Sequence, residues 1–505
     1  MTDLPAAADT PSLFGPVIYA EASHDDHLQY GIVCGAGTLP AFTCADAAEV
    51  SEPREISSFG DMRFYRWDIR IAPAPHIRRV DYTVNGTAFS FYVPGNDAGT
   101  NEFRIGYVSC NGSEKDSPLA APPPDKYALW GDLVYEHDRS PFLILLHGGD
   151  QIYADRVWHE VPALAAWMER GQKIKYAPAV TDALRAEIRS YYYRLYMLVW
   201  SQPDIRAMLS SVPSMMIWDD HDIFDGWGSW SSRRQASPVY QAIFDAALDA
   251  FLLFQRGQSN MNAGIVPNDF HLGKSVRYAD CAIIIPDLRS QRTREQVMGA
   301  SGIRWFEKQL AEAAPQRDTI VVFSVPLATG HFSALDGILT NFPDWLARIL
   351  PNKLNPKRFA DDIHDQWRVP SHRDEWRSMI SRLLDHRRET DSRVTLISGE
   401  IHMGARSTIA EDGHGAITQY IASGIAHPPM GLPVVFACEW LSRGLQDLTE
   451  ALSIKMERIY PTSRRRYIAS RNWFSLTFSR KGDSFGTWHT DGNAGVTHER
   501  RLRKK

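Results

Sequence analysis

Four short motifs in the chain carry side chains that bind metal ions or transfer protons. They read SCNG at residues 109–112, GDQIY at 149–153, WDDHD at 218–222 and SGEIH at 398–402. A hard multivalent cation needs several anionic oxygens, which carboxylates and a phenolate supply, whereas thiolate and imidazole suit iron or zinc. Gathered in the folded chain, these side chains would therefore form a metal site.

Each motif adjoins a short apolar run that predicts a buried strand. These runs cover residues 103–109, 141–146, 215–218 and 394–398. In open α/β sheets, ligands bind beyond the carboxyl ends of the strands. We therefore expect the four strand ends to present the polar side chains at one rim, on rigid supports.

The rest of the pattern predicts strands that alternate with helices. Residues 182–200 give the most regular helix, and its tyrosines predict an aromatic seam facing the core, with stacking on an aromatic ligand as the alternative. A succession of strand, helix and strand favours a parallel or mixed sheet with crossover helices, and is expected at residues 281–285, 303–314 and 320–325. A closing hairpin is expected at residues 473–478 and 485–490.

The sequence predicts two domains. Residues 1–99 read as a small all-β domain, with a sandwich as the expected form, because short alternating segments include a strong hairpin signal at Asn85-Gly86. Residues 100–505 then form an α/β domain. Within it we expect a helical insertion at 156–210 and, from the irregular pattern of residues 330–370, a lid-like segment.

The composition is that of a folded protein and does not favour nucleic-acid binding. Of 505 residues, 44% are hydrophobic and 23% are charged, and the formal net charge is -5. No apolar run of about 18 residues predicts a membrane span, and the first residues lack a signal-peptide pattern. Five cysteines, without CxxC spacing, favour a reducing compartment. Together these features predict a cytoplasmic location.

The motifs resemble a known family when they are taken together and in this order. From residue 109 to residue 402 they are similar to the alkaline phosphatase D (PhoD-like) family, a branch of the calcineurin-like metallophosphoesterases. The resemblance implies an αββα sandwich of mixed sheets, preceded here by the small all-β domain. It also implies two or more metal ions and a small phosphoester substrate, and leaves the oligomeric state open.

The resemblance assigns a ligand set to the two metals. Asp150 would bridge them, and the first metal would take Cys110, Tyr153 and His402, a thiolate and phenolate pairing that favours Fe³⁺. The second metal would take Asp220 and Glu400, and this oxygen-rich set suits Ca²⁺ or another hard divalent ion. Zn²⁺, Mn²⁺ and Mg²⁺ are the alternatives.

The implied activity is hydrolysis of a phosphomonoester or a phosphodiester by a metal-bound hydroxide that attacks phosphorus in line. His221 would donate a proton to the leaving group, and Arg289 would bind phosphate oxygens. Two alternatives remain. One is a catalytically silent relative that binds metal as a staple or ligand sensor; the other is a hydrolase of a different ester bond, although no GxSxG motif supports it.

Less specific interpretations apply to single residues. Cys110 by itself is more typical of a buried structural thiol, and only the order of the motifs favours a ligand. Asp219 and Asp222 are expected to support or cap the loop rather than bind metal. The many tryptophans are expected to pack in the core rather than to line a pocket.

Overall fold

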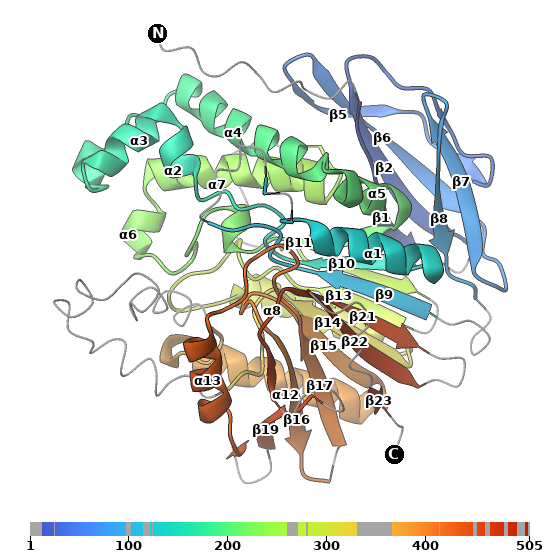
Figure 1. Cartoon of the computed structure of the whole chain (residues 1–505), viewed down its shortest axis with the longest axis vertical. Coiled ribbons are helices and arrows are strands. Elements are labelled where there is room, and N and C mark those ends of the chain that lie inside the picture. The colour runs from blue at the N-terminus through green and yellow to red at the C-terminus, as the bar shows by residue number, and fades with distance from the viewer. Residues whose placement is uncertain are drawn as a thin grey trace.

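The computed structural model describes residues 13–24, 26–96, 103–114, 122–123, 125–259, 271–278, 281–330, 366–413, 415–447, 452–459, 465–478, 483–491 and 500–502. Two large sheets pack against each other in these residues, with helices on their outer faces (Figure 1). Helix α5 contacts strand β1 of the first sheet, while α8 and α12 contact strands β13 and β15 of the second. The expected αββα arrangement is thus confirmed.

The first sheet has 11 strands among the described residues, in the order β23-β22-β21-β9-β10-β11-β1-β2-β6-β4, with β5 beside β6. Strands β9, β10 and β11 are parallel and lie at its centre. Its strands are β1 (Leu13–Ser23), β2 (Leu28–Ala36), β4 (Glu49–Val50), β5 (Arg54–Phe59), β6 (Met62–Ile71), β9 (Phe103–Val108), β10 (Ile144–Gly148), β11 (Ser214–Ile217), β21 (Asn472–Phe478), β22 (Ser484–Thr490) and β23 (Arg500–Leu502).

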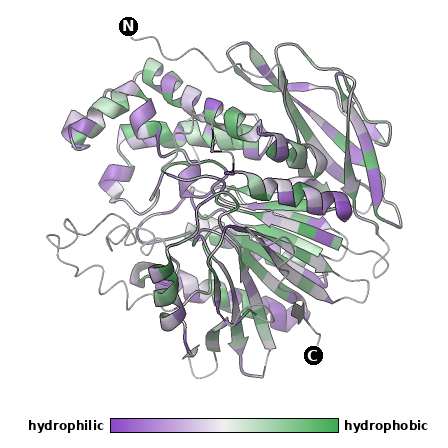
Figure 2. Ribbon diagram, viewed as in Figure 1, coloured by the Kyte–Doolittle hydropathy of each residue, from purple (hydrophilic) through white to green (hydrophobic). Residues whose placement is uncertain are grey.

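The second sheet has 9 strands in the described part of the chain, and β13, β14, β15 and β17 are parallel neighbours within it. These strands are apolar and buried, as Figure 2 shows by their green colour. The sheet comprises β12 (Lys274–Tyr278), β13 (Cys281–Ile285), β14 (Asp318–Phe323), β15 (Arg393–Ser398), β16 (Gly404–Glu411), β17 (Gly415–Ile421), β18 (Leu445–Asp447), β19 (Leu452–Glu457) and β20 (Tyr467–Ile468).

The N-terminal region is all β, as expected. A small third sheet contains β3 (Phe42–Thr43), β7 (Arg78–Val84) and β8 (Thr87–Val93). The hairpin at Asn85-Gly86 is confirmed, with φ values of 48° and 78° at these two residues. Strand β1 pairs in parallel with β11 of the first sheet, at Tyr19 opposite Ser214. Residues 97–102 lie outside the described residues, so a domain boundary at residue 99 stays a prediction.

The helices follow the predicted periodicity closely. The predicted helix at 182–200 is confirmed as α4, whose first turn is capped by Thr181 through a 3.2 Å hydrogen bond from the Leu184 N–H. The α-helices are α1 (Ala128–Arg139), α2 (Val157–Glu160), α3 (Pro162–Glu169), α4 (Asp182–Trp200), α5 (Pro203–Ser211), α6 (Ser232–Gln235), α7 (Pro238–Ala250), α8 (Gly299–Ala313), α12 (Arg373–Thr390) and α13 (Leu432–Leu441). Shorter turns are η1 (Ile174–Tyr176), η2 (Asp220–Asp222) and η5 (Pro370–His372), and a π-helical segment, η3 (Phe251–Gln255), follows α7. Most of the predicted lid-like segment, residues 331–365, lies outside the described residues.

None of the helices in the described residues has the length and apolar content that crossing a membrane requires.

The tyrosines of α4 face the core, which confirms the predicted seam. Tyr191, Tyr192 and Tyr196 are buried, and their hydroxyl groups reach the loops after β10 and β11. Tyr191 donates to the Ala154 carbonyl at 3.3 Å, Tyr192 donates to the Ile223 carbonyl, and Tyr196 donates to Asp222 at 3.4 Å. Helix α4 therefore supports the loops of two of the four motifs.

A buried ion cluster ties the N-terminal strands to the second sheet. Glu21 of β1 lies 2.8 Å from the Arg66 guanidinium and 2.7 Å from Lys274 Nζ, and all three side chains are largely buried. Burial alone would raise the pKa of Glu21, but the charges of Lys274 and Arg66 lower it below its usual value. Removing this carboxylate would leave two cations buried without it.

Glu21→Ala is expected to lower the free energy of unfolding by about 3–5 kcal/mol. Denaturant unfolding at neutral pH measures it, and the difference from the parent should shrink as the pH falls through the range where Glu21 takes up its proton. The matched control is Glu55→Ala, since Glu55 pairs with Arg63 at 3.0 Å on the surface, where such pairs contribute about 1 kcal/mol or less. Equal effects of the two variants would contradict this account.

Candidate metal centre

The carboxyl ends of the parallel strands of both sheets meet at one rim, and backbone hydrogen bonds join their loops. The Asn111 N–H after β9 donates to the Asp150 carbonyl at 2.8 Å, and the Ala154 N–H donates to the His221 carbonyl at 2.8 Å. In the second sheet, the Gly399 N–H donates to the Ser324 carbonyl at 3.2 Å. The Ser324 hydroxyl also donates to Asp219 Oδ1 at 2.9 Å, so all four predicted motifs are brought together.

Strained backbone marks this rim. Cys110, Asp150, Glu400 and His402 all have positive φ values, between 52° and 70°. Such values are uncommon for residues other than glycine, and they concentrate at functional sites. Gly149 has a φ of 107°, and a Cβ there would lie 2.6 Å from the Cβ of Asp219. The glycine of GDQIY is therefore required for the close approach of two motifs.

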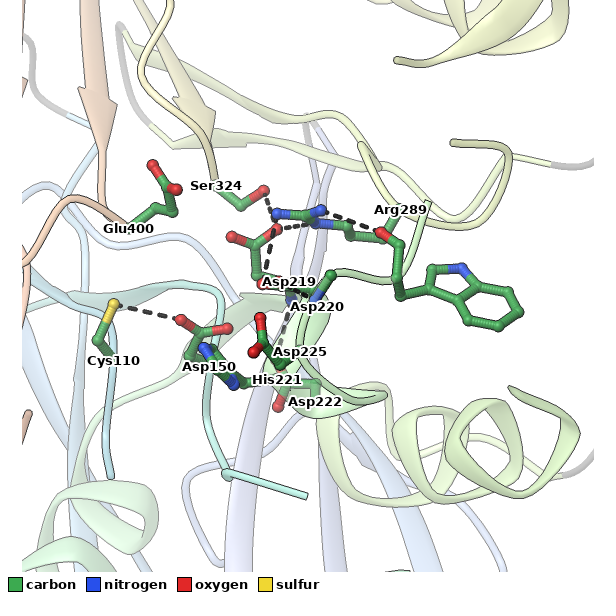
Figure 3. Close-up of polar contacts among 12 residues, drawn as sticks. Cys110, Asp150, Asp219, Asp220, His221, Asp222, Asp225, Arg289, Ser324 and Glu400 are labelled. Atoms are coloured by element: carbon green, nitrogen blue, oxygen red, sulfur yellow. Dashed lines mark hydrogen bonds and ion pairs between the residues drawn. The ribbon is translucent and has the colours of Figure 1, made fainter. Parts of the chain in front are cut away.

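Asp150 and Cys110 are in direct contact at the centre of the site (Figure 3). The Cys110 thiol lies 3.3 Å from Asp150 Oδ2 and 3.0 Å from Ser423 Oγ, and both side chains are about 1% exposed. Burial, and for each group the charge of neighbouring acids, raise the pKa of Asp150 and of the Cys110 thiol well above their ordinary values. The Asp150 carboxyl and the Cys110 thiol would therefore ionise readily only if a positive charge lay beside them.

Asp150, Asp220 and His221 form the closest group of ligand atoms in the described residues. One ligand atom from each lies within 4.8 Å of the others. Asp220 Oδ2 accepts from the Gly226 N–H at 2.8 Å, and Asp220 Oδ1 lies 3.4 Å from the Arg289 guanidinium. These contacts hold the Asp220 carboxylate beside Asp150.

His221 is held by Asp155, the last residue of the extended motif GDQIYAD. Its Nδ1 lies 2.9 and 3.0 Å from the two Asp155 oxygens. Burial alone would lower the pKa of His221, but the Asp155 and Asp220 carboxylates outweigh it and raise the pKa well above its ordinary value. Since Nδ1 faces Asp155, Nε2 is the ring nitrogen left to exchange a proton with another molecule.

An aromatic stack connects Tyr153 and His402, two further residues predicted to bind metal. The Tyr153 ring stacks on His221 with a centroid distance of 4.3 Å, and on His427 at 5.7 Å. His427 in turn stacks on His402 at 3.5 Å. Burial raises the pKa of the Tyr153 hydroxyl, while burial and the neighbouring His427 lower the pKa of His402. Both effects favour the neutral imidazole of His402, the form that binds metals.

Glu400 and Arg289 are placed differently from the other predicted site residues. The Glu400 carboxylate accepts from Gln366 Nε2 at 2.8 Å, and in Figure 3 it points away from Asp150. Arg289 is fully buried, donates to Asp219 and to the Trp227 carbonyl at 3.2 Å, and pairs with Asp220. The metal-binding role of Glu400 and the phosphate-binding role of Arg289 stay predictions.

The supporting role predicted for Asp222 is confirmed. Asp219 and Asp222 form a reciprocal capping box around η2. Asp222 also accepts from the Gln151 and Ile152 N–H groups at 2.9 and 3.2 Å, so it fixes the loop that carries Asp150. Burial raises the pKa of Asp222 to about 7. Packing of the tryptophans is likewise confirmed, because seven of them are among the largest fully buried side chains.

Sequence analysis missed three residues of the site: Asp155, Ser423 and His427. Asp155 lies five positions after Asp150, within one loop, and its acidic type next to GDQIY was a usable signal. Ser423 and His427 follow β17, an apolar strand of the same kind as those that precede the four motifs. The inference that polar residues after an apolar strand belong to the site, which gave the four motifs, would have found these two residues as well.

Comparison with known proteins agrees with this geometry. A family model described as PhoD related phosphatase matches residues 120–343. The structure is similar to that of PhoD, with a TM-score of 0.58 at 10% identity over 99% of this chain and 94% of PhoD. The resemblance to the PhoD family is confirmed.

The chain is also similar to two further proteins. Purple acid phosphatase PPD1 from yellow lupin (Lupinus luteus) seeds gives a TM-score of 0.50 at 11% identity, over 96% of this chain and 74% of PPD1. An uncharacterized protein of Saccharomyces cerevisiae, YGR266W, is 25% identical over 407 residues, which are 70% of this chain. The match spans only 57% of the yeast protein. At these identities, PhoD and PPD1 show that the chain shares their fold.

Proposed function

We propose that the chain is a metal-dependent phosphoesterase that hydrolyses a phosphomonoester or a phosphodiester of a small substrate. The observation that carries the proposal is the convergence of Asp150, Asp220 and His221 within 4.8 Å at the rim of a PhoD-like fold. Buried acids at one point are expensive unless a cation neutralises them. A pair of metal ions would supply that charge.

The donor atoms fit such ions. Among the described residues, Asp150 Oδ1 and the Tyr153 hydroxyl are buried and have no hydrogen-bond partner. Buried polar atoms are normally paired, so these two are available as ligands. We propose that Cys110, Asp150, Tyr153 and His402 hold one ion, with Fe³⁺ favoured by the thiolate and phenolate. Asp150, Asp220 and Glu400 would hold a harder divalent ion such as Ca²⁺.

When bound, the two ions would polarise phosphoryl oxygens and water and would neutralise the negative charge that develops on the oxygens bonded to phosphorus. The protein's own groups do the rest. His221 donates a proton from Nε2 to the leaving-group oxygen, and Asp155 fixes the ring and stabilises its charged form. Arg289 orients the Asp219 and Asp220 carboxylates; contact with substrate phosphate would require it to exchange these partners.

Metal analysis and a hydrolysis assay on the purified full chain test the proposal. We expect iron and a second, harder divalent ion, together with release of product from an aryl phosphodiester. Chelation should abolish this release, and adding the ions back should restore it. Bound metal without hydrolysis of any phosphoester would instead favour the silent, ligand-sensing relative, and zinc as the sole metal would contradict the assignment of iron.

A further inference from the structure

Helix α13 exposes a line of large apolar side chains. Leu432, Phe436 and Trp440 are 58%, 59% and 65% exposed. They are spaced at i, i+4 and i+8, so they share one face of the helix. Of the seven large hydrophobic side chains that are exposed in the described residues, these three lie on this one helix.

The other face of α13 is firmly packed, so the exposure does not arise from a loose helix. Val435 and Cys438 are buried in a small core with Met403, Ile421 and Tyr467. Glu439 accepts from the Tyr467 N–H at 3.0 Å and pairs with the Arg466 guanidinium at 3.5 Å. The apolar line is thus a fixed surface of the protein.

Exposed arginines occur near this line, although the chain as a whole has a negative formal charge. Arg443 lies two residues after the end of α13, Arg465 places its guanidinium 5.5 Å from the Phe436 ring centre, and Arg458 follows β19 directly; all three are exposed. Glu439 and Glu457 are already paired with Arg466 and Lys455. The formal net charge of the chain is -5, so the positive charge of this surface is opposite in sign to that of the chain as a whole.

We infer that the α13 surface, defined by Leu432, Phe436, Trp440, Arg443 and Arg465, docks on an anionic phospholipid membrane. Aromatic and aliphatic side chains on one face of a helix enter the boundary between headgroups and acyl chains, while flanking arginines attract anionic headgroups. The loop from His427 runs directly into α13, so docking would place the candidate metal centre beside membrane phosphoesters. Only this last step rests on the proposed function.

Sedimentation of the full chain with lipid vesicles tests the docking. Vesicles of phosphatidylcholine with about a third phosphatidylserine should bind the protein, and pure phosphatidylcholine vesicles should bind it far less. The double variant Phe436→Ser and Trp440→Ser should lower the partition coefficient by about tenfold or more. Arg443→Gln should lower it by about fivefold.

A matched control exists on α1, where Arg139 places its guanidinium 5.5 Å from the ring centre of Tyr135, itself 60% exposed. Tyr135→Ser should leave vesicle binding unchanged. Because the changed side chains are exposed, thermal unfolding of the variants should match that of the parent.

Equal binding of the parent to both kinds of vesicle, or undiminished binding by the double variant, would overturn the inference. It would also fall if the double variant changed the oligomeric state, because the α13 surface would then bind a second copy of the chain. Vesicle binding is measured without catalysis, so Asp150→Asn should retain it. Failure of the proposed activity and failure of docking are therefore distinguishable.

Discussion

Asp150→Asn is expected to remove most of the bound metal and to lower kcat/KM for an aryl phosphodiester by about a thousandfold or more. Asp150 contacts Cys110, lies beside Asp220 and His221, and keeps one buried oxygen without a partner among the described residues. Asparagine has the same shape but no charge, so it removes the anionic ligand while the loop keeps its packing. Metal content and kinetics are measured on the same preparation.

Asp249→Asn is the matched control for Asp150→Asn. Asp249 is also a buried carboxylate, but it pairs with Arg189 at 2.5 Å and Tyr193 at 3.0 Å on helices away from the rim. Its variant should lose stability and keep its metal and activity. If Asp150→Asn kept both ions and its rate, Asp150 would not be the bridging ligand.

His221→Ala is expected to lower kcat by about 10²–10⁴ and to leave the metal content unchanged. The loss should be greater for alkyl than for nitrophenyl leaving groups, because a poorly leaving alkoxide needs the proton more. A uniform loss across leaving groups would argue against proton donation. Loss of metal would identify His221 as a ligand, since one of its ring nitrogens lies within 4.8 Å of the ligand atoms of Asp150 and Asp220.

Asp155→Asn serves as the comparison for His221→Ala. Asp155 contacts Nδ1 of His221, not the Nε2 atom proposed to donate the proton. Its replacement should therefore lower kcat by about 10–100-fold. Removing the carboxylate lowers the pKa of His221, and the alkaline limb of the rate profile should therefore move to lower pH. An unmoved limb would show that a different group sets it.

Much of the fold could be predicted from the sequence because periodicity reports which face of an element is buried. The helix at 182–200 has the bounds that the pattern predicts, and the hairpin turns at Asn85-Gly86 as predicted. The metal-ligand motifs were also placed at strand ends, where the structure gathers them. These are local signals, and the sequence contains them in full.

Pairings between distant segments could not be predicted in the same way. The short alternating segments of the N-terminal region indicate strands but not their partners, so the contact of β1 with β11 was not foreseen. Arg289 lay at a strand end, as predicted, yet nothing in the sequence indicated that Asp219 would face it across the sheets. His427 follows the end of β17, so its place at the rim could be predicted, but nothing in the sequence indicated that its ring would stack on those of His402 and Tyr153.

The pairing of β1 with β11 bears on how the molecule can be divided. Strand β11 leads into WDDHD, and it lies between β10 and β1. A fragment beginning at residue 100 would lack β1, which pairs with β11 at Ser214, and would leave backbone groups on that edge open to strands of other molecules. Cutting the chain there would thus create an edge prone to self-association next to Asp220 and His221. The N-terminal strands therefore protect the candidate site from pairing with other molecules.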